Sequence, residues 1–337
     1  MKHILAVCAI ATATVPGTLQ ALDLRVGDVY PTGHYMSEAL TVPWMKLVEE
    51  RLGDAVNIDY FPASQLGKGP DLLSLTKQGV IDVGLIVPAF TPDKLPLSAV
   101  AELPGAFDTG CAGTKAFYEL ATGDGFLAEK EFGANGLHVL MAIVLPPYQI
   151  FTKNEITGVD SLVGQKMYST GGAKDTTVRA LQAVPVRMAT SELYEALSRG
   201  TIDGGLMGYG TALAYKVPEF AHFGTKGENF GAGVITYAVG QEKWESWPEK
   251  VRSVMDAAGR EVTMQACATI DAGVSADMAK LEKLGMTLVA MPEADRSKVD
   301  EALHSVGQQW AEELDGRSLS GTETRETFTK TLEEKTK

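Results

Sequence analysis

The chain has 337 residues, enough for one large domain or two of ordinary size. Hydrophobic residues make up 45% and charged residues 22%, which excludes a disordered tail protein, a collagen-like rod and a multi-span membrane protein. The formal net charge of −13 makes nucleic acid and anionic membranes poor general partners, although one basic pocket could still bind a small anion.

The first residues have the three-part pattern of a secretory signal. Met1 to His3 form a short basic start, and an uncharged apolar run follows over residues 4–15. That run is too short to cross a bilayer, which needs roughly 20 residues. We predict cleavage after Ala21, a periplasmic location, and no direct insertion of the mature chain into a membrane. The alternative is a buried N-terminal helix.

Cys111 and Cys267 remain in the mature chain. An oxidising compartment would allow them to pair, but their spacing gives no geometric support for a disulfide, so pairing stays open. Two cysteines and five scattered histidines do not suggest a metal site, and we predict neither a metal nor a cofactor.

Strand and helix patterns alternate through the first part of the chain. The expected elements are strands at residues 22–29, 56–61 and 81–87 and helices at residues 38–52 and 71–78. Such an alternating order is typical of a parallel α/β sheet.

The last part of the chain is predicted to be helical. Amphipathic helices are expected at residues 249–264, 266–284 and 293–314, and the polar residues 317–337 are expected to fray. Long helices here could support a dimer, but the sequence leaves the oligomeric state open.

A short pattern occurs twice, at residues 79–85 (GVIDVGL) and 200–206 (GTIDGGL). Each copy has a helix, then a glycine that can supply a left-handed C-cap, then a short strand. The alternative is chance similarity between two ordinary turns. We interpret the repeat as two α/β lobes of similar construction, whose segments 87–90 and 207–209 line the cleft between them, because ligands bind beyond the carboxyl ends of such strands.

No local catalytic motif is present. The sequence lacks a GxSxG elbow, a GxxxxGK[ST] loop, an HExxH helix and a CxxC pair. Their absence lowers the prospect of an enzyme and favours a ligand receptor. An exported enzyme with an unrecognised site remains a remote alternative.

Several segments, in order, resemble one known family. They are residues 62–67 (PASQLG), 78–82 (QGVID), 103–107 (LPGAF) and 191–197 (SELYEAL). Together they resemble the DctP-type solute-binding proteins of tripartite ATP-independent periplasmic (TRAP) transporters. The resemblance implies a two-lobed periplasmic binding protein, type II-like, with a cleft between the lobes and a long connecting helix. It also implies closure around one small solute and delivery to a membrane permease.

The resemblance and the pattern together suggest domain boundaries. We expect lobe I at residues 22–146, completed by parts of 232–337, and lobe II at residues 147–231. A helical region at residues 245–337 is expected to pack on both lobes.

Three positions depart from the family pattern. Where the family usually has an arginine that grips the ligand carboxylate with two bonds, this chain has Tyr168. A second common arginine corresponds to Gln149, and an asparagine of the family corresponds to Met207. Phenol and thioether groups suit a cation better than a buried carboxylate.

These departures lead to a ligand hypothesis, a small amine or amino alcohol such as ethanolamine. The candidate contacts are Tyr168, Met207, Gln149, Tyr148, Tyr30, Phe90 and Tyr209. Asp28, Glu102 and Glu228 are the candidate counter-charges. For each aromatic residue the alternative is packing within a lobe. The alternative ligand is an organic or sugar acid held by Lys68, Lys153 and backbone amides.

Overall fold

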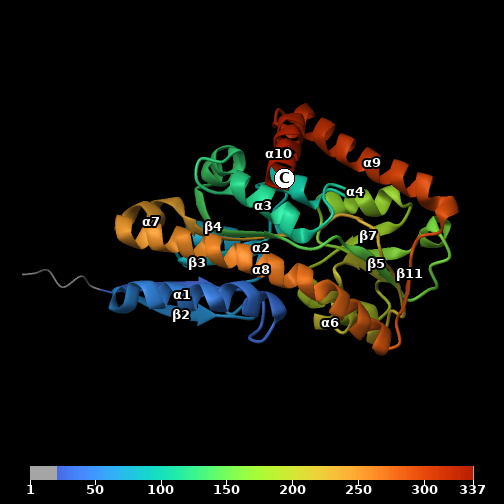
Figure 1. The fold of residues 1–337 in the computed structure, drawn as a ribbon, viewed down its shortest axis with the longest axis horizontal. Coiled ribbons are helices and arrows are strands. Elements are labelled where there is room, and N and C mark those ends of the chain that lie inside the picture. The colour runs from blue at the N-terminus through green and yellow to red at the C-terminus, as the bar shows by residue number, and fades with distance from the viewer. Residues whose placement is uncertain (1–20, 337) are drawn as a thin grey trace, which may run out of the picture.

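The computed structural model describes residues 21–336, so all of the predicted signal segment except Ala21 lies outside the described residues. The chain folds into two mixed sheets with helices around them (Figure 1). Within the described range no helix combines the length and apolar character that a bilayer span needs.

The first sheet has five strands in the order β2-β1-β3-β10-β4. The strands are Leu22–Gly27 (β1), Val56–Phe61 (β2), Val83–Ile86 (β3), Leu137–Val144 (β4) and Val234–Gly240 (β10). β1 pairs in parallel with β2 and β3, as the sequence predicts, whereas β10 runs antiparallel to β3 and β4.

The second sheet has six strands in the order β11-β9-β5-β8-β6-β7. The strands are Gln149–Thr152 (β5), Lys166–Ser169 (β6), Val184–Arg187 (β7), Gly204–Met207 (β8), Phe223–Thr225 (β9) and Thr287–Val289 (β11). β6 is parallel to β7 and β8, and β5 is antiparallel to β8. The edge strand β11 comes from the C-terminal part of the chain, far outside residues 147–231.

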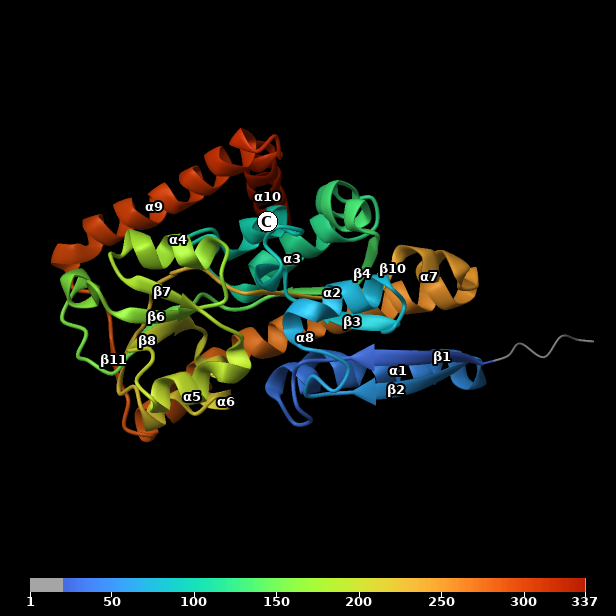
Figure 2. The same cartoon turned by 180° about the vertical axis from the view of Figure 1, so that it is seen from behind.

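Ten α-helices surround the sheets within the described residues. They are Val42–Leu52 (α1), Gly69–Lys77 (α2), Gly110–Ala121 (α3), Ala173–Ala180 (α4), Leu193–Ser198 (α5), Tyr209–Ala214 (α6), Gln241–Ser246 (α7), Glu249–Lys283 (α8), Glu293–Gly316 (α9) and Gly321–Lys335 (α10). α4 packs on α9, and α6 packs on α8 (Figure 2).

Helix α8 joins the two halves of the molecule. It is one continuous helix of 35 residues and not the two helices expected, and it contacts β4 and α1 at one end and α6 and β11 at the other (Figure 1). A helix of this length spans about 50 Å at 1.5 Å per residue. The two sheets are therefore held by one shared element.

The expected fraying of residues 317–337 is wrong for most of that segment. Residues Gly321–Lys335 form α10, which packs on α3 and α9. Gly321, Thr324 and Phe328 are buried, so this mostly charged helix docks through one face.

The repeated pattern has the same structure in both copies. Gly79 and Gly200 have φ angles of 71° and 70° after α2 and α5, as expected for left-handed C-caps. Asp82 accepts the backbone N–H of Arg25 on β1, and Asp203 accepts that of Lys166 on β6, both at 2.8 Å. Each aspartate thus ties its loop to the neighbouring parallel strand, which confirms the two copies as equivalent α/β units.

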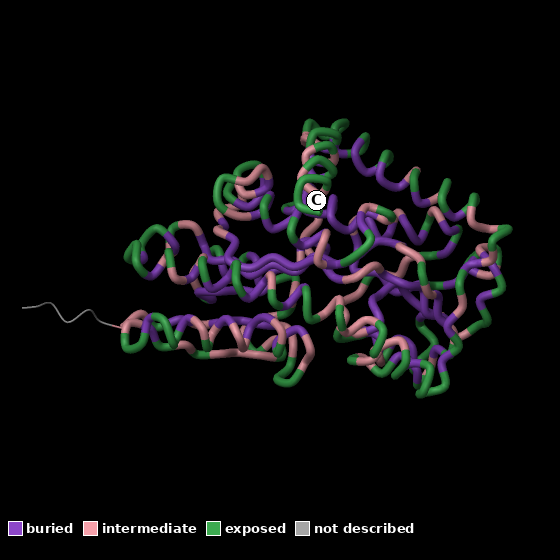
Figure 3. Tube along the Cα trace, viewed as in Figure 1, coloured by how far each residue is buried: buried purple, intermediate pink, exposed green. Residues whose placement is uncertain are grey.

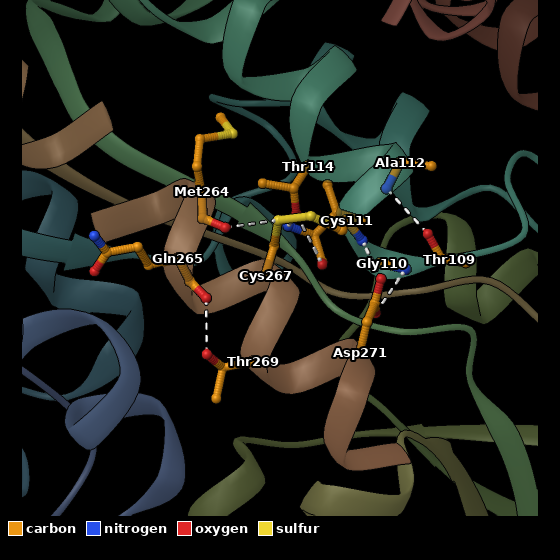
Figure 4. The surroundings of a disulfide bond; sticks show 11 residues. Thr109, Gly110, Cys111, Ala112, Thr114, Met264, Gln265, Cys267, Thr269 and Asp271 are labelled. Carbon is orange, nitrogen blue, oxygen red and sulfur yellow. Dashed lines mark hydrogen bonds between the residues drawn. A yellow bond between two sulfur atoms is a disulfide. The ribbon is translucent and has the colours of Figure 1, made fainter. Parts of the chain in front are cut away.

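Cys111 and Cys267 form a disulfide, which answers the question that their spacing left open. The bond joins α3 to α8 (Figure 4). Next to it, the Asp271 carboxylate on α8 accepts the first two N–H groups of α3, those of Gly110 at 3.1 Å and Cys111 at 2.8 Å. Covalent and polar contacts therefore fix the same end of α3.

The central strands of both sheets lie in the buried interior, whereas the edge strands β2 and β7 are largely intermediate or exposed (Figure 3). The strands β3, β5 and β10 are buried along their whole length. Such continuous burial explains why these strands read as apolar runs without clear alternation.

Candidate functional site

A cavity among the described residues lies at the carboxyl ends of strands from both sheets. Its volume is about 650 Å³. It is lined by residues that follow β1 and β3 of the first sheet and by residues in or after β6 and β8 of the second. This placement is the one expected from the repeat, with Val87, Phe90 and Met207 among the lining residues.

Aromatic rings make up a large part of the cavity lining. The lining rings are Tyr30, His34, Tyr35, Phe90, Tyr148, Tyr168 and Tyr215. Tyr30 and His34 are stacked, with ring centroids 4.3 Å apart and an interplanar angle of 8°. Flat rings from both halves of the molecule therefore surround the space, which suits a flat apolar ligand.

Five of the seven candidate contacts of the amine hypothesis line this cavity: Tyr30, Phe90, Tyr148, Tyr168 and Met207. The Tyr168 hydroxyl lies 2.7 Å from Thr190 Oγ1. Burial raises the pKa of Tyr168, so its phenol stays protonated at neutral pH. The ring of Tyr168 is therefore available as a wall, while its hydroxyl already has a protein partner.

Gln149 and Tyr209 do not line the cavity, contrary to expectation. The Gln149 side chain donates to the Glu228 carbonyl at 2.5 Å and accepts from Thr225 at 2.9 Å. The Tyr209 hydroxyl donates to the Thr225 carbonyl at 3.2 Å, and its ring lines a separate cavity of about 180 Å³ against α8. The polar groups of both side chains are therefore already hydrogen-bonded to residues in or next to β9.

Asp28 is buried and has internal partners, and it does not line the cavity. Its Oδ2 accepts hydrogen bonds from three hydroxyls, those of Thr41 at 2.8 Å, Tyr237 at 2.9 Å and Tyr60 at 3.1 Å. Its Oδ1 accepts the backbone N–H of Tyr30 at 2.8 Å. Burial raises the pKa of Asp28. The carboxylate anchors the loop after β1 and is not a free counter-charge.

The other two acids proposed as counter-charges are also engaged. Glu102 is fully buried, and its Oε1 lies 3.1 Å from the ammonium nitrogen of Lys174, which is 2% exposed. Glu228 accepts the Met291 N–H at 3.2 Å and lies 3.6 Å from the Arg296 guanidinium. Neither acid lines the cavity.

Lys174 is a lining residue that the sequence reasoning missed. It lies in the first turn of α4, and its ammonium nitrogen is 5.7 Å from the centroid of the Tyr148 ring. The sequence feature that could have identified Lys174 is its position just after the glycine pair 171–172, which follows the strand of Tyr168.

The two lysines proposed for an acid ligand lie in different places. Lys68 lines the cavity, whereas Lys153 lies outside it and donates to the Leu197 carbonyl at 2.6 Å.

His34 and Thr170 are two further polar lining residues that the sequence reasoning missed. Both line the cavity, and His34 Nε2 and Thr170 Oγ1 are buried without a hydrogen-bond partner among the described residues. The one acid in the lining is Glu192, whose carboxylate accepts the Ala189 N–H at 3.1 Å. The cavity thus presents more donors and positive charge than free negative charge.

The geometry does not suggest a metal centre. The described residues contain no group of three or more His, Cys, Asp or Glu side chains placed to hold a metal ion. The arrangement can instead bind an organic molecule by ring contacts and a few polar groups.

The sequence matches a family described as bacterial extracellular solute-binding protein, family 7, over residues 26–314. The C4-dicarboxylate-binding periplasmic protein DctP of Rhodobacter capsulatus is 27% identical over 226 residues, which are 65% of each chain. The predicted resemblance to DctP-type proteins is thereby confirmed.

Solved structures share the fold. A TRAP solute-binding protein from Rhodoferax ferrireducens, in complex with copurified benzoate, has a TM-score of 0.85 at 22% identity and covers 93% of this chain and 98% of its own. A marine metagenome TRAP solute-binding protein specific for aromatic acid ligands, in complex with metahydroxyphenylacetate, has a TM-score of 0.85 at 22% identity and covers 93% and 99%. These likenesses show the two-lobed fold.

Proposed function

This chain belongs to family 7 of the bacterial extracellular solute-binding proteins, and from that premise we propose that it is the receptor of a TRAP transporter for an aromatic monocarboxylic acid. The acid bridges the two lobes, and the closed form is selected because only it makes both sets of contacts. The receptor then delivers the acid to a membrane permease.

The observation that carries this proposal is the buried ammonium group of Lys174 at the cavity. An ammonium group has three donors, and the Glu102 carboxylate takes one of them. A carboxylate in a dry cavity needs a charged donor, or its desolvation is not compensated. Lys174 supplies such a charged donor in place of the arginine that Tyr168 replaces, and Thr170, also in the lining, has a neutral hydroxyl without a partner among the described residues.

The size and lining of the cavity support an aromatic body on the ligand. A volume of about 650 Å³ lies within the range of roughly 300–1,000 Å³ that is common for small-molecule sites. Ethanolamine, with four non-hydrogen atoms, would leave most of that space empty. Solved structures of the same fold with benzoate and metahydroxyphenylacetate bound add to this argument.

The amine hypothesis has less support than the acid hypothesis. A buried ammonium ligand needs a free carboxylate, whereas Asp28, Glu102 and Glu228 lie outside the lining and each is paired with a protein group. Glu192 is the acid that could still meet an amine. Ethanolamine is therefore kept as a competing ligand in the test.

The test measures binding by calorimetry and thermal shift on the mature protein after removal of any copurified molecule. The probes are benzoate, 3-hydroxybenzoate, glucuronate and ethanolamine. We expect the aromatic acids to bind, and Lys174→Gln to weaken them at least tenfold, because a hydrogen bond to a charged donor contributes about 1.5–3 kcal/mol.

Removing Lys174 alone would leave Glu102 buried and unpaired, which can unfold the protein. The double variant Lys174→Gln with Glu102→Gln avoids that charge and should show the same loss of acid binding. Lys153→Gln is the matched control, since its ammonium group lies outside the cavity. Binding of ethanolamine but no aromatic acid would overturn the proposal, and turnover of a bound acid would favour the exported enzyme.

A further inference from the structure

We propose that His34 is an uncharged hydrogen-bond donor that selects aromatic acids carrying a neutral oxygen acceptor, such as a hydroxyl or carbonyl group, in addition to their carboxylate. This inference rests on the proposed function. It assigns the second polar contact of the ligand to the first lobe, while Lys174 holds the carboxylate from the second.

The hydrogen bonds around His34 determine which ring nitrogen carries the proton. The Met36 N–H donates to Nδ1 at 3.2 Å, so Nδ1 is an acceptor and carries no hydrogen. In a neutral imidazole the proton is then on Nε2. Nε2 is buried, and it has no partner among residues 21–336. His34, a residue of the cavity lining, therefore has one unused N–H.

The surroundings of His34 keep this donor neutral. Burial lowers the pKa of His34 to about 4, so the ring is uncharged at neutral pH. A neutral N–H binds a hydroxyl or carbonyl oxygen without the desolvation penalty of a second buried ion pair. It gives little attraction for a second carboxylate, so the site favours substituted monocarboxylates over dicarboxylates.

The ring of His34 is held in place by its neighbours. It stacks on Tyr30, with centroids 4.3 Å apart, and lies 4.8 Å from Tyr35 and 5.8 Å from Tyr215. Asp28 in turn accepts the Tyr30 N–H and fixes the start of this loop. A donor held in advance loses little entropy on binding, which makes its hydrogen bond selective.

An unpaired buried donor also has an energetic consequence. Leaving it without a partner is unfavourable, and a ligand acceptor would recover that free energy. Only ligands whose acceptor reaches the Nε2–H group of His34 gain this free energy. Unsubstituted benzoate would bind through Lys174 and the aromatic walls alone.

The experiment compares the affinities of benzoate with those of 2-, 3- and 4-hydroxybenzoate for the wild-type protein and for His34→Phe. Phenylalanine keeps a flat ring for the stack on Tyr30 and removes the donor. We expect the wild type to prefer one hydroxybenzoate over benzoate, and His34→Phe to reduce that preference about 3- to 10-fold. Benzoate affinity should change less than twofold.

His222→Phe is the matched control, because His222 is exposed and does not line the cavity. If His34→Phe does not fold, the ¹⁵N resonances of His34 in the wild-type protein provide the test. The Nε2 signal should shift more with the preferred hydroxybenzoate than with benzoate.

The outcomes separate the two proposals. If no aromatic acid binds the wild type, the proposed function fails. If the acids bind but the preference is the same in His34→Phe, or the Nε2 signal is indifferent to the hydroxyl group, the role of His34 is overturned while the receptor function stands.

Discussion

At the scale of single residues, the structure changes the role of every acid that the sequence suggested for the ligand. Asp28 ends up with four internal hydrogen bonds, and Glu102 with a buried ammonium partner. Buried carboxylates rarely remain free, because an unpaired one is costly. Their positions near the cleft were foreseeable, but their partners come from segments up to 209 residues away.

Glu102 gives a test that separates an acid from an amine ligand. Glu102→Gln removes a negative charge beside Lys174, so it should strengthen binding of an aromatic acid by on the order of tenfold. An amine ligand would instead bind more weakly or unchanged. Calorimetry with benzoate and ethanolamine measures both.

The same substitution should lower the melting temperature of the ligand-free protein, since Lys174 loses its partner. Bound acid should restore most of that loss. Glu293→Gln, which removes an exposed carboxylate, is the control and should change neither property.

Glu131 makes the stability of the protein depend on pH. Its buried carboxyl accepts the N–H groups of Leu97 and Ser98 and the Ser98 hydroxyl. Burial raises the pKa of Glu131 to about 7. Because the folded state holds the proton more tightly than the unfolded state, this group stabilises the fold below its unfolded pKa, and the stabilisation is lost as pH rises through about 7.

We expect the free energy of unfolding to fall by up to ~3 kcal/mol between about pH 4.5 and pH 7.5 from this group. Urea unfolding across that range measures it. Glu131→Gln should remove this part of the pH dependence, while Glu129→Gln, an exposed neighbour in the same turn, should retain it. An equal slope in the wild type and Glu131→Gln would contradict the assignment.

At the scale of elements, the packing of α8 depends on two glycines with different surroundings. A Cβ on Gly259 would collide with the backbone carbonyl of Leu140 on β4, so this glycine allows the helix to lie close to the first sheet. A Cβ on Gly273 would meet nothing within 4 Å. The helix is continuous through both positions.

Alanine at these two positions should therefore have opposite effects. Gly259→Ala should lower the free energy of unfolding by about 2 kcal/mol or more, because backbone cannot move aside easily. Gly273→Ala should raise it by about 0.5–1 kcal/mol through helix propensity. Denaturant unfolding of both variants compares them directly, and equal effects would show that the close approach to β4 is unimportant.

At the scale of the whole molecule, α8 contacts elements of both sheets, and the disulfide ties it to α3, which packs on β4 of the first sheet. The disulfide joins residues 156 positions apart and agrees with the oxidising compartment expected of an extracellular solute-binding family. The Tyr35 hydroxyl lies 3.2 Å from Thr211 Oγ1, so one polar contact already crosses from the first half of the chain to the second.

Much of the architecture could be predicted from local sequence. The strand at Val56–Phe61 matches the alternating run, and the glycines at 79 and 200 end their helices as expected. These features depend on backbone preferences and neighbouring side chains, which a short stretch of sequence contains. The order of motifs was likewise enough to suggest the family.

Other features were decided only by the tertiary structure. The disulfide, the pairing of Glu102 with Lys174 and the unpaired Nε2 of His34 each depend on residues that meet through the fold. A sequence shows which side chains carry charge, but the partner that neutralises a buried charge is chosen by distance in three dimensions. By itself the sequence indicated three parallel strands of the first sheet, the repeat and the kind of receptor, and the fold decided which groups remain free to bind a ligand.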